Sequence, residues 1–117
     1  MDSTVTVSID GMGGDDAPEM IIEGIEVACQ KNKNIHFLIF GDEAILSNLL
    51  TRHPNAQAVC EIRHAPDVVS MDDKPTVALR SGKSSSMRMA IDAVKNKEAS
   101  AVVSAGNTGA LMAMATI

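Results

Sequence analysis

Hydrophobic and polar residues alternate along this chain with two periodicities, one typical of strands and one typical of helices. Val5–Ile9 is β-branched and alternates with period two, which predicts a strand. Ile35–Phe40 is a nearly continuous apolar run, the pattern of a parallel strand that is covered on both faces. Two further strands are predicted at Val59–His64, with a more exposed side, and at Ala101–Ser104.

Helical spacing fills the segments between these strands. Asp16 and Glu19 have capping-box spacing and Pro18 fits the first helical turn, so a helix is expected to begin here. Pro54 is expected to end the second helix, and Thr76–Ser81 to form a short one. The positions expected to face the core are Met20, Ile21, Ile25 and Ala28, then Ile45, Leu46, Leu49 and Leu50, and finally Met87, Ala90, Ile91 and Val94.

This regular alternation of strands and helices predicts an α/β fold with a mainly parallel sheet and helices on its faces. With 117 residues, the chain is one domain or part of one. The apolar helical pattern still continues at Ile117, without a residue that would end a helix. We therefore expect residues 1–117 to be the N-terminal part of a larger fold that is truncated at its C-terminus.

Composition excludes several function classes. Ten Lys and Arg against fifteen Asp and Glu give a net charge of −5, and the only aromatic residues are Phe37 and Phe40. This balance disfavours nucleic acid as a partner, because neither a basic surface nor a stacking platform is present. The N-terminus does not resemble a signal peptide, and no apolar run approaches the roughly 20 residues of a membrane span. Cys29 and Cys60 show no paired spacing, which favours a cytoplasmic protein with reduced, packed thiols.

Two glycine-rich loops follow predicted strands, Asp10–Asp16 and Ser104–Ala110. In a parallel sheet, the loops that follow the strands emerge at the same edge, so both loops are expected to face one pocket. Glycine permits close approach of the backbone to a ligand, and a helix N-terminus attracts an anion. The alternative is that each loop is only a tight turn between a strand and a helix.

Neither loop carries a nucleotide fingerprint. Gly11–Gly14 does not fit G-x-G-x-x-G, because Asp16 occupies the position of the final glycine. Gly82-Lys83-Ser84 resembles the end of a P-loop, but Val77 stands where that motif has its first glycine. A nicotinamide-dependent dehydrogenase and a Walker-type nucleotide site are both disfavoured.

A basic cluster surrounds the predicted helix start at Ser84–Ser86. Arg80, Lys83 and Arg88 lie near these serines, and fixed positive charge together with hydroxyl and amide donors suits a phosphate. The alternative is a capped helix with solvated basic residues. The three histidines share no spacing with cysteines or carboxylates, so neither a metal nor another cofactor is expected.

Four segments together resemble one family, the bacterial phosphate acyltransferases of phospholipid synthesis (PlsX). Asp10–Pro18 resembles the D-x-M-G-G-D-x-x-P opening of that family, and Phe40–Asp42 also matches in place. Arg80–Met87 and Ser104–Ala110 are similar to two further signature segments. All four occur in the family's order and cover essentially the whole chain.

The resemblance implies an enzyme that transfers a fatty acyl group from acyl carrier protein to inorganic phosphate, giving acyl phosphate. It also implies a Rossmann-like αβα sandwich, a homodimer in the full-length form, and a cytoplasmic protein with peripheral membrane association. Family members are considerably longer, so the missing C-terminal part would supply the dimer contacts and the membrane-binding helix.

For this reaction we expect an anion cradle, donors to the oxyanion of the thioester, and no nucleophile from the protein. Ser104, Gly106, Asn107 and Thr108 would donate to phosphate or oxyanion, Gly13 and Gly14 would allow close approach, Lys83 and Arg88 would supply charge, and Asp10 would orient a donor. Asn107, Ser104 and Lys83 are the predicted catalytic residues; the predicted substrate-binding residues are Asp10, Gly13, Gly14, Asp15, Ser84, Ser85, Arg88, Gly106, Thr108 and Gly109.

Two rival interpretations stay open. The chain could be a module that binds phosphate or acyl carrier protein without catalysis. It could also be an isolated folding unit without a function of its own, which would expose apolar surface along Leu111–Ile117.

Overall fold

Four parallel strands form the centre of the fold in the computed structural model, which describes residues 4–116. They are β1 (Val5–Asp10), β2 (Ile35–Gly41), β3 (Cys60–His64) and β4 (Ala101–Val103). The sheet order is β3-β2-β1-β4, and all three pairings are parallel. This confirms the predicted α/β class with a parallel sheet. The expectations that concern residues 1–3 and the chain's end at Ile117 lie outside the described residues.

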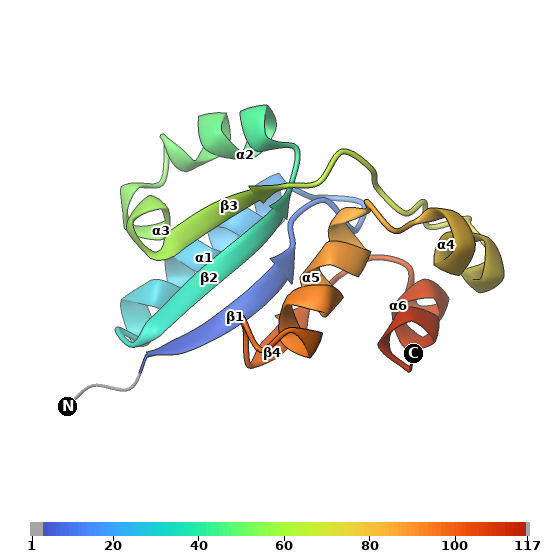
Figure 1. The fold of residues 1–117 in the computed structure, drawn as a ribbon. Coiled ribbons are helices and arrows are strands. Elements are labelled where there is room, and N and C mark those ends of the chain that lie inside the picture. Colours follow the sequence, from blue (N-terminus) through green and yellow to red (C-terminus); the bar gives the residue numbers. More distant parts are fainter. Residues whose placement is uncertain (1–3, 117) are drawn as a thin grey trace.

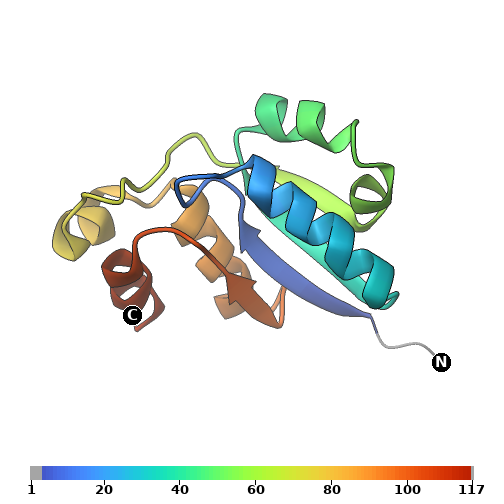
Figure 2. The ribbon, with the colours of Figure 1, turned by 180° about the vertical axis from the view of Figure 1, so that it is seen from behind.

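Helices cover both faces of this sheet (Figures 1 and 2). One face carries α1 (Glu19–Lys31), α2 (Glu43–Leu50) and α3 (Pro54–Val59), and the other carries α5 (Ser86–Lys95). Two further helices, α4 (Pro75–Ser81) and α6 (Thr108–Ala115), pack against each other beside α5. The molecule is therefore a Rossmann-like αβα sandwich with a small helical extension.

Each face of the sheet has its own hydrophobic core. Ile9, Phe37 and Ile39 meet α1, α2 and α3 on one face, and Leu38 and Phe40 meet α5 on the other. The near-continuous apolar run of β2 is thus buried on both sides, as its pattern predicts. A third core joins α4, α5 and α6.

Several local expectations were wrong. Pro54 does not only end a helix: it begins α3, because its fixed φ suits the first helical position. The capping box does not form, since α1 begins after Pro18 without a side-chain cap. Met20 and Ile45 are exposed rather than buried, because the buried stripes of α1 and α2 are centred one or more positions further along each helix.

The strand order reverses at β1. From β1 the chain continues to β2 and β3 on one side of the sheet, and it then returns to add β4 on the other side of β1. In open α/β sheets, ligands bind at such a switch point, outside the carboxyl ends of the strands. The two glycine-rich loops leave β1 and β4 at this point. Within residues 4–116, no helix combines the length and the apolar composition needed to cross a bilayer.

Candidate active site

Asp10, the last residue of β1, lies at the centre of the candidate site. Its side chain is 1 % exposed and accepts four hydrogen bonds. The amides of Met12 and Gly13 donate to Oδ1 at 3.2 and 3.0 Å, and the Ser86 hydroxyl donates to the same oxygen at 2.5 Å. The Ser104 hydroxyl donates to Oδ2 at 2.8 Å. One buried carboxylate therefore joins the loop after β1, the loop after β4 and the start of α5.

The two glycine loops are in direct contact. A Cβ atom added to Gly13 would collide with the Asp10 carboxylate and would lie 3.1 Å from the Gly106 Cα. Gly14 has a φ of +105° and lies against the carbonyl of Ala105. Because only glycine accommodates this approach and this backbone conformation, the sequence requires glycine here for the two loops to meet.

Ser104 connects Asp10 to the main chain of the second loop. Its hydroxyl donates to Asp10 and accepts a hydrogen bond from the Gly106 amide at 3.1 Å. A Cβ atom at Gly106 would lie 3.0 Å from the Met87 Cε, so this loop also fits closely against α5. The hydroxyl of Ser104 is thus engaged on both sides, and what it controls is the direction of the Gly106 amide.

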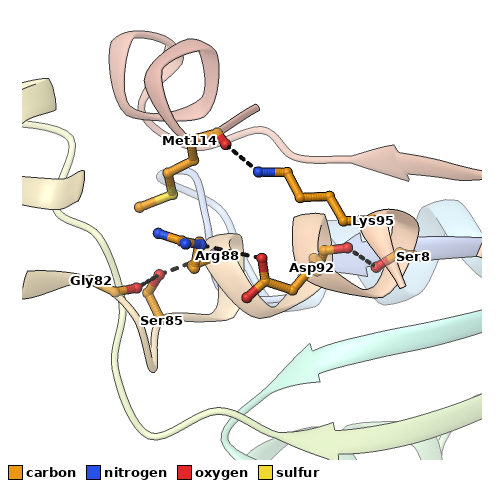
Figure 3. A network of polar contacts seen from close by, with 8 residues as sticks. Ser8, Gly82, Ser85, Arg88, Asp92, Lys95 and Met114 are labelled. Atoms are coloured by element: carbon orange, nitrogen blue, oxygen red, sulfur yellow. Dashed lines mark hydrogen bonds and ion pairs between the residues drawn. The ribbon is translucent and has the colours of Figure 1, made fainter. Parts of the chain in front are cut away.

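The serines at the start of α5 have three different environments. Ser85 is the N-cap, and its hydroxyl accepts from the Arg88 amide and donates to the Gly82 carbonyl (Figure 3). This confirms the predicted capping role of the serine run. Ser84 is exposed, whereas Ser86 is fully buried and reaches Asp10.

Asn107 fastens an irregular segment to the site. Its side-chain oxygen accepts from the Ala110 amide as the N-cap of α6, at 3.1 Å. Its Nδ2 donates to the carbonyls of Ser70 and Asp73 at 3.0 and 2.7 Å. The side chain therefore holds the segment 66–74 against the loop after β4.

The first two residues of α6 are Thr108 and Gly109. Their amides have no carbonyl partner inside the helix, as at any helix N-terminus, so this end of α6 suits an anion. A Cβ atom at Gly109 would lie 2.7 Å from the Pro75 Cγ, so the close packing of α6 on α4 also requires glycine at this position.

The predicted basic residues do not converge on the loops. Arg88 forms an ion pair with Asp92 at 3.2 Å along α5 (Figure 3). Lys83 and Arg80 are exposed and form no ion pair within the described part of the chain. Asp15 is exposed in the first loop. The structure thus brings Asp10, Gly13, Gly14, Ser104 and Gly106 together and leaves Lys83, Arg88 and Asp15 at the periphery.

Ser86 is the residue that sequence reasoning missed. It was grouped with the capping serines, although it shares the spacing i, i+4, i+7 with the buried Ala90 and Ala93. A polar residue within a buried helical stripe must find a partner inside the protein, and that spacing was the available signal.

The cysteines lie away from this site. Cys29 is buried in α1, and burial, with a smaller contribution from Cys29, raises the pKa of the Cys60 thiol to about 12. Cys60 therefore behaves as a packed thiol, since a thiol with so high a pKa is not ionised near neutral pH. Residues 4–116 contain no group of three His, Cys, Asp or Glu side chains arranged to hold a metal ion.

Known proteins share this sequence pattern. A family profile described as "Fatty acid synthesis protein" matches residues 5–117. The phosphate acyltransferase of Rhodospirillum rubrum is 49% identical over 117 residues, which is 100% of this chain and 34% of that protein. Those of Rhodospirillum centenum and Parvibaculum lavamentivorans are 50% and 54% identical, covering 98% and 97% of this chain and 32% of each relative. The chain thus spans about a third of the length of these relatives.

Proposed function

The chain belongs to the fatty acid synthesis protein family, and we propose that it forms the N-terminal part of a phosphate acyltransferase. The reaction is the transfer of a fatty acyl group from the thioester of acyl carrier protein to inorganic phosphate. The observation that carries the proposal is the contact of two glycine loops around Asp10 at the switch point of the sheet. Relatives about 50% identical to the chain are named phosphate acyltransferases.

The chemistry requires orientation and charge stabilisation. A phosphate oxygen attacks the thioester carbonyl, the carbonyl oxygen becomes an oxyanion, and the carbon–sulfur bond then breaks to release the thiolate and acyl phosphate. Main-chain amides are the donors best suited to both anions here, because the side chains of Ser104 and Asn107 already have partners. We assign this role to the main-chain amides at the start of α6, at Asn107, Thr108 and Gly109. The Gly106 amide donates to Ser104 and holds the loop that precedes them.

The remaining site residues act around these amides. Gly13 and Gly14 let the first loop approach the second, and Asp10 fixes both. Lys83 and Ser84 are exposed just before α5, and with Arg88 their positive charge and donors would attract phosphate toward the loops. Ser85 would act by capping the helix that carries Arg88. Asp15, at the exposed tip of the first loop, would contact the incoming substrate.

The partners follow from the same proposal. Acyl carrier protein delivers the acyl group and inorganic phosphate receives it. We further propose a cytoplasmic homodimer with peripheral attachment to the membrane, both supplied by the part of the full-length protein that corresponds to the remaining two thirds of the relatives.

Release of thiol from acyl carrier protein thioester, with and without inorganic phosphate, tests this function. The full-length protein should release thiol only when phosphate is present. The same assay on residues 1–117 alone decides whether this part is a binding module: no release there, with release by the full-length form, would show that the catalytic apparatus extends beyond it. Equal release with and without phosphate by the full-length form would reject the proposal.

A further inference from the structure

Ser86 and Asp10 form a buried contact between residues that are 76 positions apart. Ser86 is 0 % exposed and Asp10 is 1 % exposed. The Ser86 hydroxyl donates to Asp10 Oδ1 at 2.5 Å, and charge-assisted hydrogen bonds of this kind are among the strongest in proteins. Of the four hydrogen bonds that the Asp10 carboxylate accepts within residues 4–116, this one alone comes from α5.

We propose that Ser86 is a positioning residue for the transfer of the acyl group to phosphate. Its hydroxyl sets the orientation of the Asp10 carboxylate and thereby the position of the two glycine loops relative to each other. This inference rests on the proposed function. Ser86 itself touches neither substrate. It acts through Asp10, and its effect reaches the substrates through the amides of the loops.

The donors to Asp10 are divided unequally between its two oxygens. Oδ1 accepts hydrogen bonds from the amides of Met12 and Gly13 and from the Ser86 hydroxyl, whereas Oδ2 accepts one from the Ser104 hydroxyl. With Ser86 in place, Oδ1 faces α5 and the first loop, so Oδ2 is directed at the second loop. Ser104 then holds the Gly106 amide at 3.1 Å. A continuous series of hydrogen bonds therefore runs from α5 to the main chain at Gly106, directly before the N-cap of α6 and the amides that begin this helix.

The main chain of Ser86 extends this series to a third strand end. The Ser86 amide donates to the Asp67 carbonyl at 2.9 Å, and the Asp67 amide donates to the Ser84 carbonyl at 3.3 Å. Asp67 lies shortly after β3, at the same edge of the sheet. Ser86 thus connects the segments that follow β1, β3 and β4.

Ser8 provides a matched control. It is also 0 % exposed, and its hydroxyl donates to the Ala90 carbonyl at 2.7 Å, so it joins the same strand and the same helix (Figure 3). It does not contact Asp10. Ser8→Ala and Ser86→Ala each remove one buried hydroxyl between β1 and α5, but only the second affects the carboxylate.

The experiment uses the full-length protein and measures phosphate-dependent thiol release together with thermal unfolding. Ser86→Ala should lower kcat/KM for phosphate by at least about tenfold, while KM for the acyl carrier protein thioester changes by less than about twofold. Ser8→Ala should destabilise the protein to a similar extent and leave both kinetic constants within about twofold of wild type.

A double variant distinguishes positioning through Asp10 from a general weakening of the fold. Ser86→Ala and Ser104→Ala act through one carboxylate, so together they should cost less than the product of their separate losses. Ser8→Ala combined with Ser104→Ala should give the product, because Ser8 lies outside this series of contacts.

Equal kinetic losses in Ser86→Ala and Ser8→Ala would overturn the inference, as would multiplicative losses for Ser86→Ala with Ser104→Ala. If Ser86→Ala does not fold, Ser86→Cys keeps a side-chain donor at this position, a far weaker one on a somewhat larger side chain, and the same phosphate-specific loss is required of it. A wild-type protein without phosphate-dependent release would reject the proposed function and this inference with it, whereas an active wild type with an unaffected Ser86 variant would reject the inference alone.

Discussion

The polar side chains at the strand ends mainly hold the site together. Asp10, Ser104 and Asn107 each form hydrogen bonds to other parts of the protein. The groups that remain for an anion are above all the main-chain amides at the start of α6, because the amides of Gly13 and Gly106 already donate to Asp10 and Ser104. At the scale of single residues, therefore, substitutions should act on catalysis by displacing the backbone.

Asn107 allows the effect of holding the segment 66–74 to be separated from the effect of helix capping. Asn107→Ala should lower the free energy of unfolding by more than about 1 kcal/mol, because it removes the cap of α6 and also leaves the carbonyls of Ser70 and Asp73 without their donor. Asp42→Ala removes a cap alone, since the Ile45 amide is the one donor to the Asp42 side chain among residues 4–116. Urea denaturation of both variants measures the loss. Equal decreases in the free energy of unfolding would contradict the proposal that Asn107 also holds the segment 66–74 against the loop after β4.

Cys60 gives a prediction for alkaline pH. Its pKa is raised to about 12 in the folded state, mainly by burial, so the unfolded chain ionises this thiol first. The stabilisation that the protonated thiol contributes is complete below the unfolded pKa and is lost as the pH rises toward 12. The free energy of unfolding should therefore fall over this interval more steeply in wild type than in Cys60→Ala. Parallel pH profiles for the two proteins would exclude this contribution.

At the scale of elements, the loops depend on glycine where the backbones approach each other. Gly13 and Gly106 lie in contact, and Gly14 needs a positive φ. Gly24 differs, because it lies within α1 and a Cβ atom there would meet nothing within 4 Å. The two kinds of glycine should respond to alanine in opposite directions.

Gly13→Ala should separate the loops, since its Cβ atom has no room beside Asp10 and Gly106. We expect phosphate-dependent activity of the full-length protein to fall by a factor of about 100 or more. Gly24→Ala should instead raise the free energy of unfolding of the chain by about 0.5–1 kcal/mol, because alanine has the higher helix propensity. Enzyme assays and urea titrations of the two variants test the pair; normal activity in Gly13→Ala would mean that the loops do not need to touch.

The elements also show how far sequence patterns reach. The strands, their parallel pairing and the two loops at one edge were predictable, because periodicity and glycine content are local signals. The helix α3 was missed because Pro54 was interpreted as a stop, while the same residue also suits a helix start. The sequence pattern does not predict that the polar face of β1 is buried. Ser8 and Asp10 lie under α5, and their hydrogen-bond partners in α5 are some 80 positions away in sequence.

At the scale of the whole molecule, the sheet is incompletely covered beside β4. Ile9, Ile25, Phe37 and Val103 line an apolar groove of about 220 Å³ between α1 and the edge strand. The chain spans about a third of its relatives, and Val103 is 52 % exposed. The expected exposure along Leu111–Ile117 is only partly present, because Met112 is exposed while Met114 is buried.

A hydrophobic dye should therefore bind residues 1–117 at this groove. Val103→Lys places a charge on its wall and should lower the bound-dye fluorescence by about half or more. Val27→Lys is the control, since Val27 is equally exposed on α1 but does not line the groove. Equal fluorescence in the two variants would show that the dye binds elsewhere.

The two loops joined by Asp10 are proposed to hold phosphate for attack on an acyl thioester. The most direct test is the rate of acyl phosphate formation by the full-length protein as phosphate is varied, in wild type and in Gly106→Ala, whose Cβ atom would press on Met87 and Ser104. We predict saturable, phosphate-dependent formation in wild type and a loss of at least about tenfold in kcat/KM for phosphate in a folded variant. Acyl phosphate formed at the same rate by both proteins would place the chemistry elsewhere and contradict the claim.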